Sequence, residues 1–377
     1  MIDKDTHPSS IHPPIPPTPE VERLARLRLL RSRRVGVATF RRLLGEYQSA
    51  QAALDALPGI ARHAGETRYA VCAQAQVEEE LRAGAAIGAR LIHDIDPDYP
   101  AALLELPNAP PCIWCLGQID MLKKPAVALV GARNASSLGT RMAKALAADL
   151  GAAGYIVVSG LARGVDTAAH LAALPTGTIA VQAGGVDVIY PVENTDLAAS
   201  IAQHGLRLSE TPIGLQPAAR HFPARNRLVA GLAKATVVVE AALRSGSLIT
   251  ARDALDLGRE VMAVPGHPFD GRAGGGNALL RDGATLVRSA QDVLEALAPL
   301  AAPAAPSPAP QAAVTLPCNT APIRQMILDR LGAAPLAEDQ LMRDLDANAA
   351  DLTPALIELE LNGEIRRQAG GLVMRNS

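Results

Sequence analysis

The central part of the chain alternates between short, β-branched apolar runs and longer helical segments. The runs predicted as strands are 126–130, 155–159, 178–181, 206–209, 236–240 and 261–264. Alanine-rich segments such as 139–150 and 248–257 lie between them and predict helices. The strands lack polar alternation, which is typical of strands covered on both faces. We therefore predict an α/β fold over residues 86–298, with an extended Rossmann-like parallel sheet wrapped by helices.

Different patterns flank this core. Residues 1–18 hold a cluster of prolines and little to bury, which predicts a disordered tail. Leu24, Leu27 and Leu30 recur at helical spacing, so a small helical domain is expected over 19–85. Prolines among alanines at 299–317 predict an extended linker. Residues 318–377 predict a winged helix: three helices, the last at 351–361 in the recognition-helix place, then a strand pair turning at Gly370-Gly371.

The charge limits how this protein could bind nucleic acid. The 377 residues carry a net charge of −2, so any DNA site is expected to be a local pocket rather than a broad basic surface. Of the 36 basic residues 31 are arginine, whose planar guanidinium suits phosphate. Eight arginines gather between residues 23 and 42, which fits a solvated helix face, with a DNA-backbone contact as the alternative.

Cysteine content and the absence of targeting signals indicate a compartment. Four cysteines, Cys72, Cys112, Cys115 and Cys318, are too few for a disulfide scaffold and fit a reducing environment. The first residues lack a signal-peptide pattern, and no apolar run is long enough for a membrane span. We expect a cytoplasmic protein.

Three predicted strand-to-helix loops combine a glycine, a hydroxyl and an arginine. They lie at 131–137, 159–166 and 242–247, all at the carboxyl ends of strands, where open α/β sheets bind ligands. Backbone N–H groups at a helix start and a nearby guanidinium both favour phosphate. One such loop is usually only a helix cap, but three at one sheet edge predict an anion site.

The segment 220–227 adds the most informative pattern. Arg225 and Arg227 fall near the positive end of a helix predicted to begin at Pro223, and no acidic residue within 211–239 offsets them. Phe222, one of three phenylalanines, stands beside them where a base could stack. The alternative is that Phe222 anchors the core and the arginines pair with distant carboxylates. Asn277, after three glycines, either lines the same crevice or belongs to a plain turn.

Several motifs of enzymes and cofactor sites are absent. The chain has no G-x-x-x-x-G-K-[ST], no G-x-G-x-x-G after the first strand and no G-x-S-x-G. We expect no catalytic residue, cofactor or metal. Cys112 and Cys115 form a C-x-x-C, which we assign to an apolar strand, and the aspartates of 94–98 resemble a calcium loop without its glycine. His170, in a predicted helix, is expected to be structural.

The motifs of the core resemble those of the DprA (Smf) family of DNA-processing proteins. The matching stretches are Val130-Gly131-Ala132-Arg133, Ser159-Gly160-Leu161-Ala162-Arg163-Gly164-Val165-Asp166, Tyr190-Pro191-Val192-Glu193-Asn194, Ser209-Glu210-Thr211-Pro212, Phe222-Pro223-Ala224-Arg225-Asn226-Arg227, Ser245-Gly246-Ser247-Leu248-Ile249-Thr250-Ala251, Val264-Pro265-Gly266 and Asp282-Gly283-Ala284. The resemblance spans about 86–297, and the flanks look like the optional helical and winged-helix domains of the family.

The resemblance implies a dimer that binds single-stranded DNA and recruits the RecA recombinase during natural transformation, displacing single-strand binding protein, without catalysis. With the loop residues identified above, the predicted DNA-binding set is Arg133, Gly160, Arg163, Phe222, Arg225, Asn226, Arg227, Ser245, Gly246, Ser247, Thr250 and Asn277. Three stretches depart from the family pattern, one of them Gln182-Ala183-Gly184-Gly185 in place of L-G-x-G. Ala132 replaces a serine, and Arg34-Val35-Gly36 replaces the G-x-G of a helix-hairpin-helix, which argues against duplex binding by the helical domain.

Two other functions stay open at this point. One is a nucleotide-cleaving phosphoribohydrolase on a related Rossmann core, although its P-G-G-x-G-T-x-x-E motif is absent. The other is a regulator that binds duplex DNA through the winged helix, although Glu358, Glu360 and Glu364 disfavour contact with phosphate there.

Overall fold

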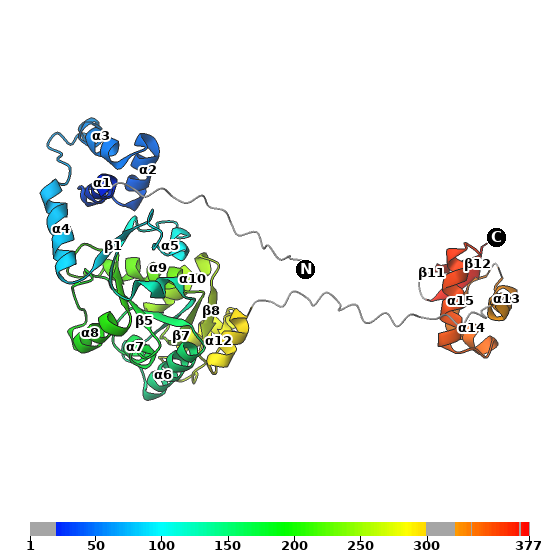
Figure 1. Ribbon diagram of the computed structural model, residues 1–377. Helices are drawn as coiled ribbons and strands as arrows, with labels where there is room; N and C mark the ends of the chain where they lie inside the picture. The colour runs from blue at the N-terminus through cyan, green and yellow to red at the C-terminus, as the bar shows by residue number, and fades with distance from the viewer. Residues whose placement is uncertain (1–19, 299–320, 333, 369–370, 377) are drawn as a thin grey trace, which may run out of the picture. The chain divides into compact units, whose positions relative to one another are not determined.

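The computed structural model describes residues 20–298, 321–332, 334–368 and 371–376, in two compact units that divide after Pro299 (Figure 1). The predicted tail, 1–18, and the predicted linker, 299–317, lie outside the described residues. Within these ranges, no helix combines the length and the hydropathy that crossing a bilayer requires.

The first unit is built on a nine-stranded sheet with the order β1-β2-β6-β5-β4-β3-β7-β8-β9. Its strands are β1 (Arg90–His93), β2 (Cys112–Gly117), β3 (Ala126–Gly131), β4 (Ile156–Ser159), β5 (Thr178–Val181), β6 (Leu206–Ser209), β7 (Ala235–Glu240), β8 (Glu260–Ala263) and β9 (Thr285–Leu286). Strands β3 to β9 pair in parallel, while β2 pairs antiparallel with β6 and β1 antiparallel with β2. The predicted α/β class is confirmed, and the six predicted strands are found within one residue of their expected bounds.

Helices cover both faces of this sheet, as the unbroken apolar strands predicted. One face carries α5 (Ala101–Leu104), α9 (His221–Leu232), α10 (Ser247–Asp256) and α11 (Gly274–Arg281); the other carries α6 (Ser137–Ala152), α7 (Val165–Ala173), α8 (Thr195–His204) and α12 (Ala290–Leu297). Short 3-10 helices lie at Ile119–Lys123 and Val192–Asn194. Along β3, Ala128 and Val130 face the first layer, while Val127 and Leu129 face the second. Both cores are almost entirely aliphatic.

The order of the strands creates a crevice at one edge of the sheet. After β3 the chain adds β4, β5 and β6 on one side, and it then crosses to add β7, β8 and β9 on the other. The loop after β3 therefore leads to α6 on one face, whereas the loop after β7 leads to α10 on the opposite face. Neighbouring loops that diverge in this way leave the ligand-binding crevice of an open α/β sheet.

Four helices precede the sheet: α1 (Glu20–Arg31), α2 (Val37–Tyr47), α3 (Ala50–His63) and α4 (Gln74–Ala86). Helices α1 to α3 share a core that includes Phe40, Leu43 and Leu54, which confirms the predicted helical domain. Arg34, at the first glycine position of the hairpin motif, adopts a left-handed backbone with a φ of 63°. Its guanidinium lies 3.3 Å from Glu66, so this cation is partly neutralised.

The arginine-rich run is only in part the solvated face that we expected: Arg33, Arg34, Arg41 and Arg42 are exposed, but others are largely buried in ion pairs. Arg26 pairs with Asp94 at 2.7 Å, with only 10% and 1% of the two side chains exposed, and Arg41 reaches the same carboxylate at 2.5 Å. Arg23 pairs with Asp96 at 2.7 Å. The aspartates after β1 that resemble a calcium loop are thus the partners of the helical arginines, and together they hold the helical domain on the sheet.

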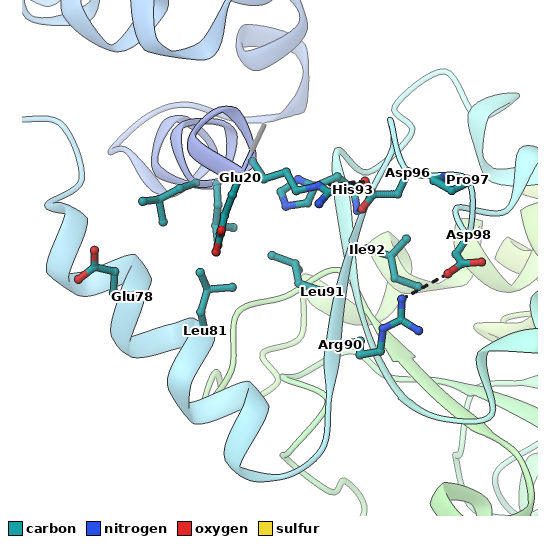
Figure 2. Close-up of a pocket in the computed structure, with 13 residues that line it drawn as sticks. Glu20, Glu78, Leu81, Arg90, Leu91, Ile92, His93, Asp96, Pro97 and Asp98 are labelled. Carbon is teal, nitrogen blue, oxygen red and sulfur yellow. Dashed lines mark hydrogen bonds and ion pairs between the residues drawn. The ribbon is translucent and has the colours of Figure 1, made fainter. Parts of the chain in front are cut away.

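The fourth helix completes this junction. The indole Nε1 of Trp114 in β2 donates to Glu80 of α4 at 2.9 Å, and a Cβ at Gly84 would lie only 2.3 Å from the indole ring. A cavity of about 570 Å³ remains between α1, α4 and β1, where Leu81 and Leu91 face each other (Figure 2). Trp114 is the only tryptophan of the chain, so its fluorescence reports on this contact.

The second unit is a winged helix, as predicted. It comprises α13 (Ala321–Arg330), β10 (Leu336–Ala337), α14 (Glu338–Asp344), α15 (Ala349–Leu361), β11 (Ile365–Gln368) and β12 (Leu372–Arg375). Its three strands form a separate antiparallel sheet in the order β10-β12-β11. Helix α15 holds the recognition-helix place and begins two residues before the predicted start, because the side chain of Asn348 caps it. The predicted turn at Gly370-Gly371 lies partly outside the described residues.

Replacing Asp94 by alanine should strongly destabilise the first unit. The substitution leaves the Arg26 guanidinium buried without its carboxylate, which costs about 3–5 kcal/mol of unfolding free energy in comparable buried pairs. Urea unfolding followed by Trp114 fluorescence measures this change. As a control, Asp98→Ala removes the more exposed partner of Arg90 and Lys123 and should leave the midpoint nearly unchanged. Equal midpoints for wild type and Asp94→Ala would show that the pairing contributes nothing.

Candidate nucleic-acid interface

A cavity of about 600 Å³ occupies the crevice between the loops after β3, β4 and β7 and the start of α9. Nine of the predicted DNA-binding residues line it: Arg133, Gly160, Phe222, Arg225, Asn226, Ser245, Gly246, Ser247 and Thr250. Segments separated by more than a hundred residues thus meet at one place. The sequence predicted that these loops form one pocket at this edge of the sheet, and the structure agrees. That DNA binds in the pocket stays a prediction.

Phe222 forms a ridge between this cavity and a smaller one of about 280 Å³, and it lines both. The Arg133 guanidinium lies over its ring at 5.2 Å from the centroid, a cation–π contact. The Tyr190 ring lies against it at a centroid distance of 5.5 Å and an interplanar angle of 55°. Arg163 lines the smaller cavity and lies 3.9 Å from Glu193. The ridge therefore carries an aromatic face and an exposed cation side by side.

Arg225 lines both cavities, but its guanidinium is occupied. The side chain is buried and donates to the carbonyl oxygens of Gly160 and Val181. Burial lowers its pKa to about 10, although the nearby charge of Asp166 opposes that shift. A Cβ at residue 160 would lie 2.5 Å from the guanidinium, so a larger residue here would displace Arg225 from its carbonyl partners. Arg225 thus fixes the loop after β4 rather than presenting a free cation.

Asp166 completes the support beneath this loop. Its carboxylate is buried and accepts from the backbone N–H groups of Gly160 at 3.1 Å and Ala162 at 3.3 Å. Burial raises the pKa of Asp166, while Arg225 and these hydrogen bonds act in the opposite direction. The carboxylate and Arg225 therefore hold the loop from two sides, which defines the floor of the crevice.

The helix starts at this edge are not equally open to an anion. At α6, Ser136 accepts from the Gly139 N–H at 2.9 Å, and Glu240 accepts from the Ser136 N–H at 3.0 Å. A carboxylate of the protein thus already takes the place that we expected for a phosphate. At α10 the N-cap residue is Gly246, and the Ser247 N–H donates to the Ser245 hydroxyl at 3.4 Å. The first turn of α10 contains no acidic residue, so of these two starts it is the one without a carboxylate in the place of an anion.

Two predicted site residues lie outside both cavities. Arg227 pairs with Glu210, which follows β6 one residue before the interval 211–239 that the sequence shows to be free of acids. Burial raises the pKa of Glu210, and the Arg227 charge opposes this. Asn277 uses its amide on the backbone of Gly266, accepting at 3.1 Å and donating at 2.9 Å. These two side chains stabilise neighbouring segments.

Two further arginines line the larger cavity but were not among the predicted site residues. Arg244 and Arg272 are both exposed there, and Arg272 pairs with Asp270 at 3.1 Å. In the part of the chain that the structure describes, Arg133 and Arg244 form no ion pair. Arg244 lies in the 242–247 loop, so its position after β7 was the available signal. Arg133 and Arg244 are the cations best placed for an external anion.

His170 supports the same crevice from α7. Its Nε2 accepts from the Leu161 N–H at 3.3 Å, and its Nδ1 lies 2.8 Å from the Thr178 hydroxyl. That hydroxyl donates to Val157 at 2.7 Å, so the Nδ1–H donates to the hydroxyl and the ring is neutral. Burial lowers the pKa of His170 to about 3, and the charge of Arg225 lowers it further. The predicted structural role of His170 agrees with these contacts.

The fold and the crevice match a known family. The family model described as DNA recombination-mediator protein A matches residues 90–298. The chain belongs to this family. Models of the DprA-like N-terminal HHH domain and the DprA winged helix domain match residues 20–83 and 298–371. Members of this family are DNA-processing proteins of recombination, and the resemblance that the core motifs indicated is confirmed.

Relatives within the family are substantially identical over the core. DNA processing protein DprA of Streptococcus pneumoniae is 46% identical over 202 residues, which cover 53% of this chain and 71% of that protein. A putative DNA processing protein DprA of Mycobacterium tuberculosis is 41% identical over 270 residues, or 68% of each chain. Protein Smf of Escherichia coli is 42% identical over 202 residues, covering 53% of this chain and 54% of that one.

Two solved structures of the family share the fold. DprA from Streptococcus pneumoniae aligns with a TM-score of 0.56 at 42% identity, covering 59% of this chain and 77% of that chain. DNA processing protein A from Helicobacter pylori, described for its single-stranded DNA binding mode, aligns with a TM-score of 0.52 at 32% identity. That alignment covers 56% of this chain and 96% of the Helicobacter chain.

The neutral state of His170 predicts acid sensitivity of the first unit. The unfolded residue takes up a proton near pH 6.5 and the folded one only near pH 3, so the stability it contributes is complete above 6.5 and is lost as the pH falls. Between pH 7 and pH 5 the linkage predicts a loss of about 2 kcal/mol. Urea unfolding at several pH values should show a shallower pH slope for His170→Asn than for wild type, and a wild-type slope for the exposed-site control His204→Asn. An unchanged slope in His170→Asn contradicts this assignment.

Proposed function

We propose that this protein binds single-stranded DNA in the crevice and delivers the strand to the RecA recombinase, without catalysing a reaction on it. The observation that carries the proposal is the Phe222 ridge, which places an aromatic face beside the exposed guanidinium of Arg133 and between two cavities. The solved relative from Helicobacter pylori, described for binding single-stranded DNA, supports the same ligand here.

Phosphates of the strand would be bound by the exposed cations of the crevice. Arg133 and Arg244 both line the larger cavity, and the start of α10, which holds no carboxylate, adds the positive end of a helix dipole. Arg163 would extend the contact into the smaller cavity, because its 3.9 Å distance from Glu193 is too long for a hydrogen bond. A few local contacts of this kind are compatible with a net charge of −2.

A base would stack on the ring of Phe222. Stacking on an aromatic face does not depend on base identity, so the contact suits a protein that accepts any sequence. A duplex does not offer its base faces, because the bases are stacked within it. This difference favours an unpaired strand as the ligand over duplex DNA.

Delivery to RecA would follow from holding the strand by a few contacts. We propose that the chain acts as a homodimer in the cytoplasm, since two crevices on one strand raise avidity without new contacts. Such a clamp would compete with single-strand binding protein and present bare strand to RecA during natural transformation. The buried Asp166 carboxylate beneath the crevice is engaged by backbone N–H groups, so it is poorly placed to activate a water molecule. This engagement favours the binding role over the phosphoribohydrolase alternative.

Removing the two unpaired cations should weaken binding and its salt dependence together. Arg133→Ala combined with Arg244→Ala should bind a fluorescein-labelled oligo-dT roughly tenfold or more weakly, and the slope of log K against log salt should fall by about 1.4. Fluorescence anisotropy at several salt concentrations measures both quantities. Lys144→Ala, an exposed cation of α6 outside both cavities, is the matched control and should behave as wild type.

The same anisotropy assay distinguishes the stacking contact of Phe222 from the ionic contacts of the arginines. Phe222→Ala should weaken binding by about 1–3 kcal/mol while the salt slope stays that of wild type.

Free base release from nucleoside monophosphates by the wild type would instead support the phosphoribohydrolase alternative. Preference of the wild type for duplex over single-stranded DNA would refute the assignment of the crevice.

RecA delivery has its own test. On an oligonucleotide coated with single-strand binding protein, the wild type should shorten the lag before RecA hydrolyses ATP. The Arg133→Ala, Arg244→Ala double variant should leave the lag as long as it is without the protein. If the wild type binds the strand but does not change the lag, the crevice remains a DNA site and the RecA step of the proposal is wrong.

A further inference from the structure

The exposed face of α15 is a surface that the DNA crevice does not use. In a winged helix this helix enters the major groove, where it is flanked by phosphates and usually carries cations. Here none of its 13 residues is lysine, arginine or histidine. Contact with a duplex would therefore bring no favourable charge from the helix that should make the closest approach.

The charges around α15 are predominantly negative. Residues 321–376 contain six arginines and nine aspartates and glutamates, a net charge of −3. Arg324 of α13 is held by Glu358 at 2.8 Å and by Glu364 at 3.1 Å, and Arg367 of β11 lies 3.6 Å from Glu360. Arg324 is thus already paired, and Arg367 lies nearer to Glu338, at 3.1 Å, than to Glu360.

An apolar stripe follows the middle of this face. Pro354, Ile357 and Leu361 recur at spacings of three and four, which places them on one side of the helix. Ile357 is 45% exposed and Leu361 is 83% exposed, while Leu352 and Leu356 on the opposite side are buried in the core. Large apolar side chains grouped on the surface and rimmed by charge are typical of protein contacts.

We propose that this face of α15 docks a basic, amphipathic segment of another protein. Apolar side chains of the segment would cover Ile357 and Leu361, and its lysines or arginines would face Glu360 and Asp351. An amphipathic helix with anchors three or four residues apart has this complementary chemistry. The surface belongs to the second unit alone, so the inference does not depend on the DNA crevice.

The negative charge disfavours two other occupants. A second copy of the same face would oppose surfaces of equal sign, which repel each other. Duplex DNA would place its phosphates against Asp351 and Glu360 with no cation on the helix to offset them. A cationic protein segment removes both penalties, because it supplies the missing charge.

The test selects the ligand chemistry directly. A display library of randomised helical peptides is selected on the immobilised full-length protein, after depletion on the variant Ile357→Ser, Leu361→Ser. Enriched peptides should combine apolar residues three or four apart with an excess of lysine and arginine. A labelled peptide of this kind should bind the wild type roughly tenfold or more tightly than the double variant, and salt should weaken it.

Controls separate a lost surface from a lost fold. Both substituted side chains are exposed, so circular dichroism, thermal melting and single-stranded DNA binding of the double variant should match the wild type. Met326→Ser, which removes an exposed apolar side chain of α13, should retain the peptide. The proposal fails if no enriched peptide distinguishes the double variant, or if the enriched peptides are acidic. It also fails if the double variant loses self-association or duplex DNA binding that the wild type shows.

Discussion

The buried guanidinium of Arg225 is the contact on which the crevice depends. It bridges the carbonyl oxygens of Gly160 after β4 and Val181 at the end of β5, and it comes from α9, which packs on the sheet beside both strands. Burying a cation is costly, and Asp166 beneath it supplies the compensating charge. Gly160 leaves room for this guanidinium. Phe222 lies one helical turn before Arg225 in α9, so the hydrogen bonds of Arg225 also fix the position of the Phe222 ring. The sequence indicated that Arg225 binds phosphate, whereas in the structure Arg225 holds the crevice residues in place.

One residue type therefore performs three tasks in this chain. Arg225 and Arg26 are buried and fix loops or domains, and Arg227 is neutralised by Glu210. Arg133 and Arg244 stay exposed at the rim of the crevice. A count of arginines cannot separate these tasks, since each depends on whether a carboxylate or carbonyl lies within reach. The near balance of 36 basic and 38 acidic residues supplies carboxylate partners for guanidinium groups such as those of Arg23, Arg31 and Arg227.

The parts that the sequence predicted and those that it missed differ in the range of the interactions involved. Strands β3 to β8 are rich in apolar, often β-branched residues and are covered on both faces, so local composition marks them within one residue. By contrast β1 and β9 lie at the two edges of the sheet and contain only two apolar residues (Leu91 and Ile92) and one (Leu286), so they give little apolar signal of their own. Arg26 and Asp94 are 68 residues apart in the chain, so no local sequence pattern indicates that they pair. Asn277 was grouped with the crevice because it follows glycines, yet its amide fits the backbone of Gly266. Arg244 shows the converse, since a strand-to-helix loop already marked its position.

Charged residues have different roles in the two units. In the first, cations gather where diverging loops leave room, and two carboxylates at the same edge of the sheet, Asp166 and Glu240, are engaged by backbone and hydroxyl groups. In the second, the helix that a winged helix usually offers to DNA has lost every cation and carries an apolar stripe. An acidic surface of this kind cannot compete with the crevice for phosphate, so a strand bound by this protein would be drawn to one site only. The same charge that disfavours nucleic acid at α15 favours basic protein surfaces, so a strand in the crevice and a protein segment on α15, as proposed, would not displace each other.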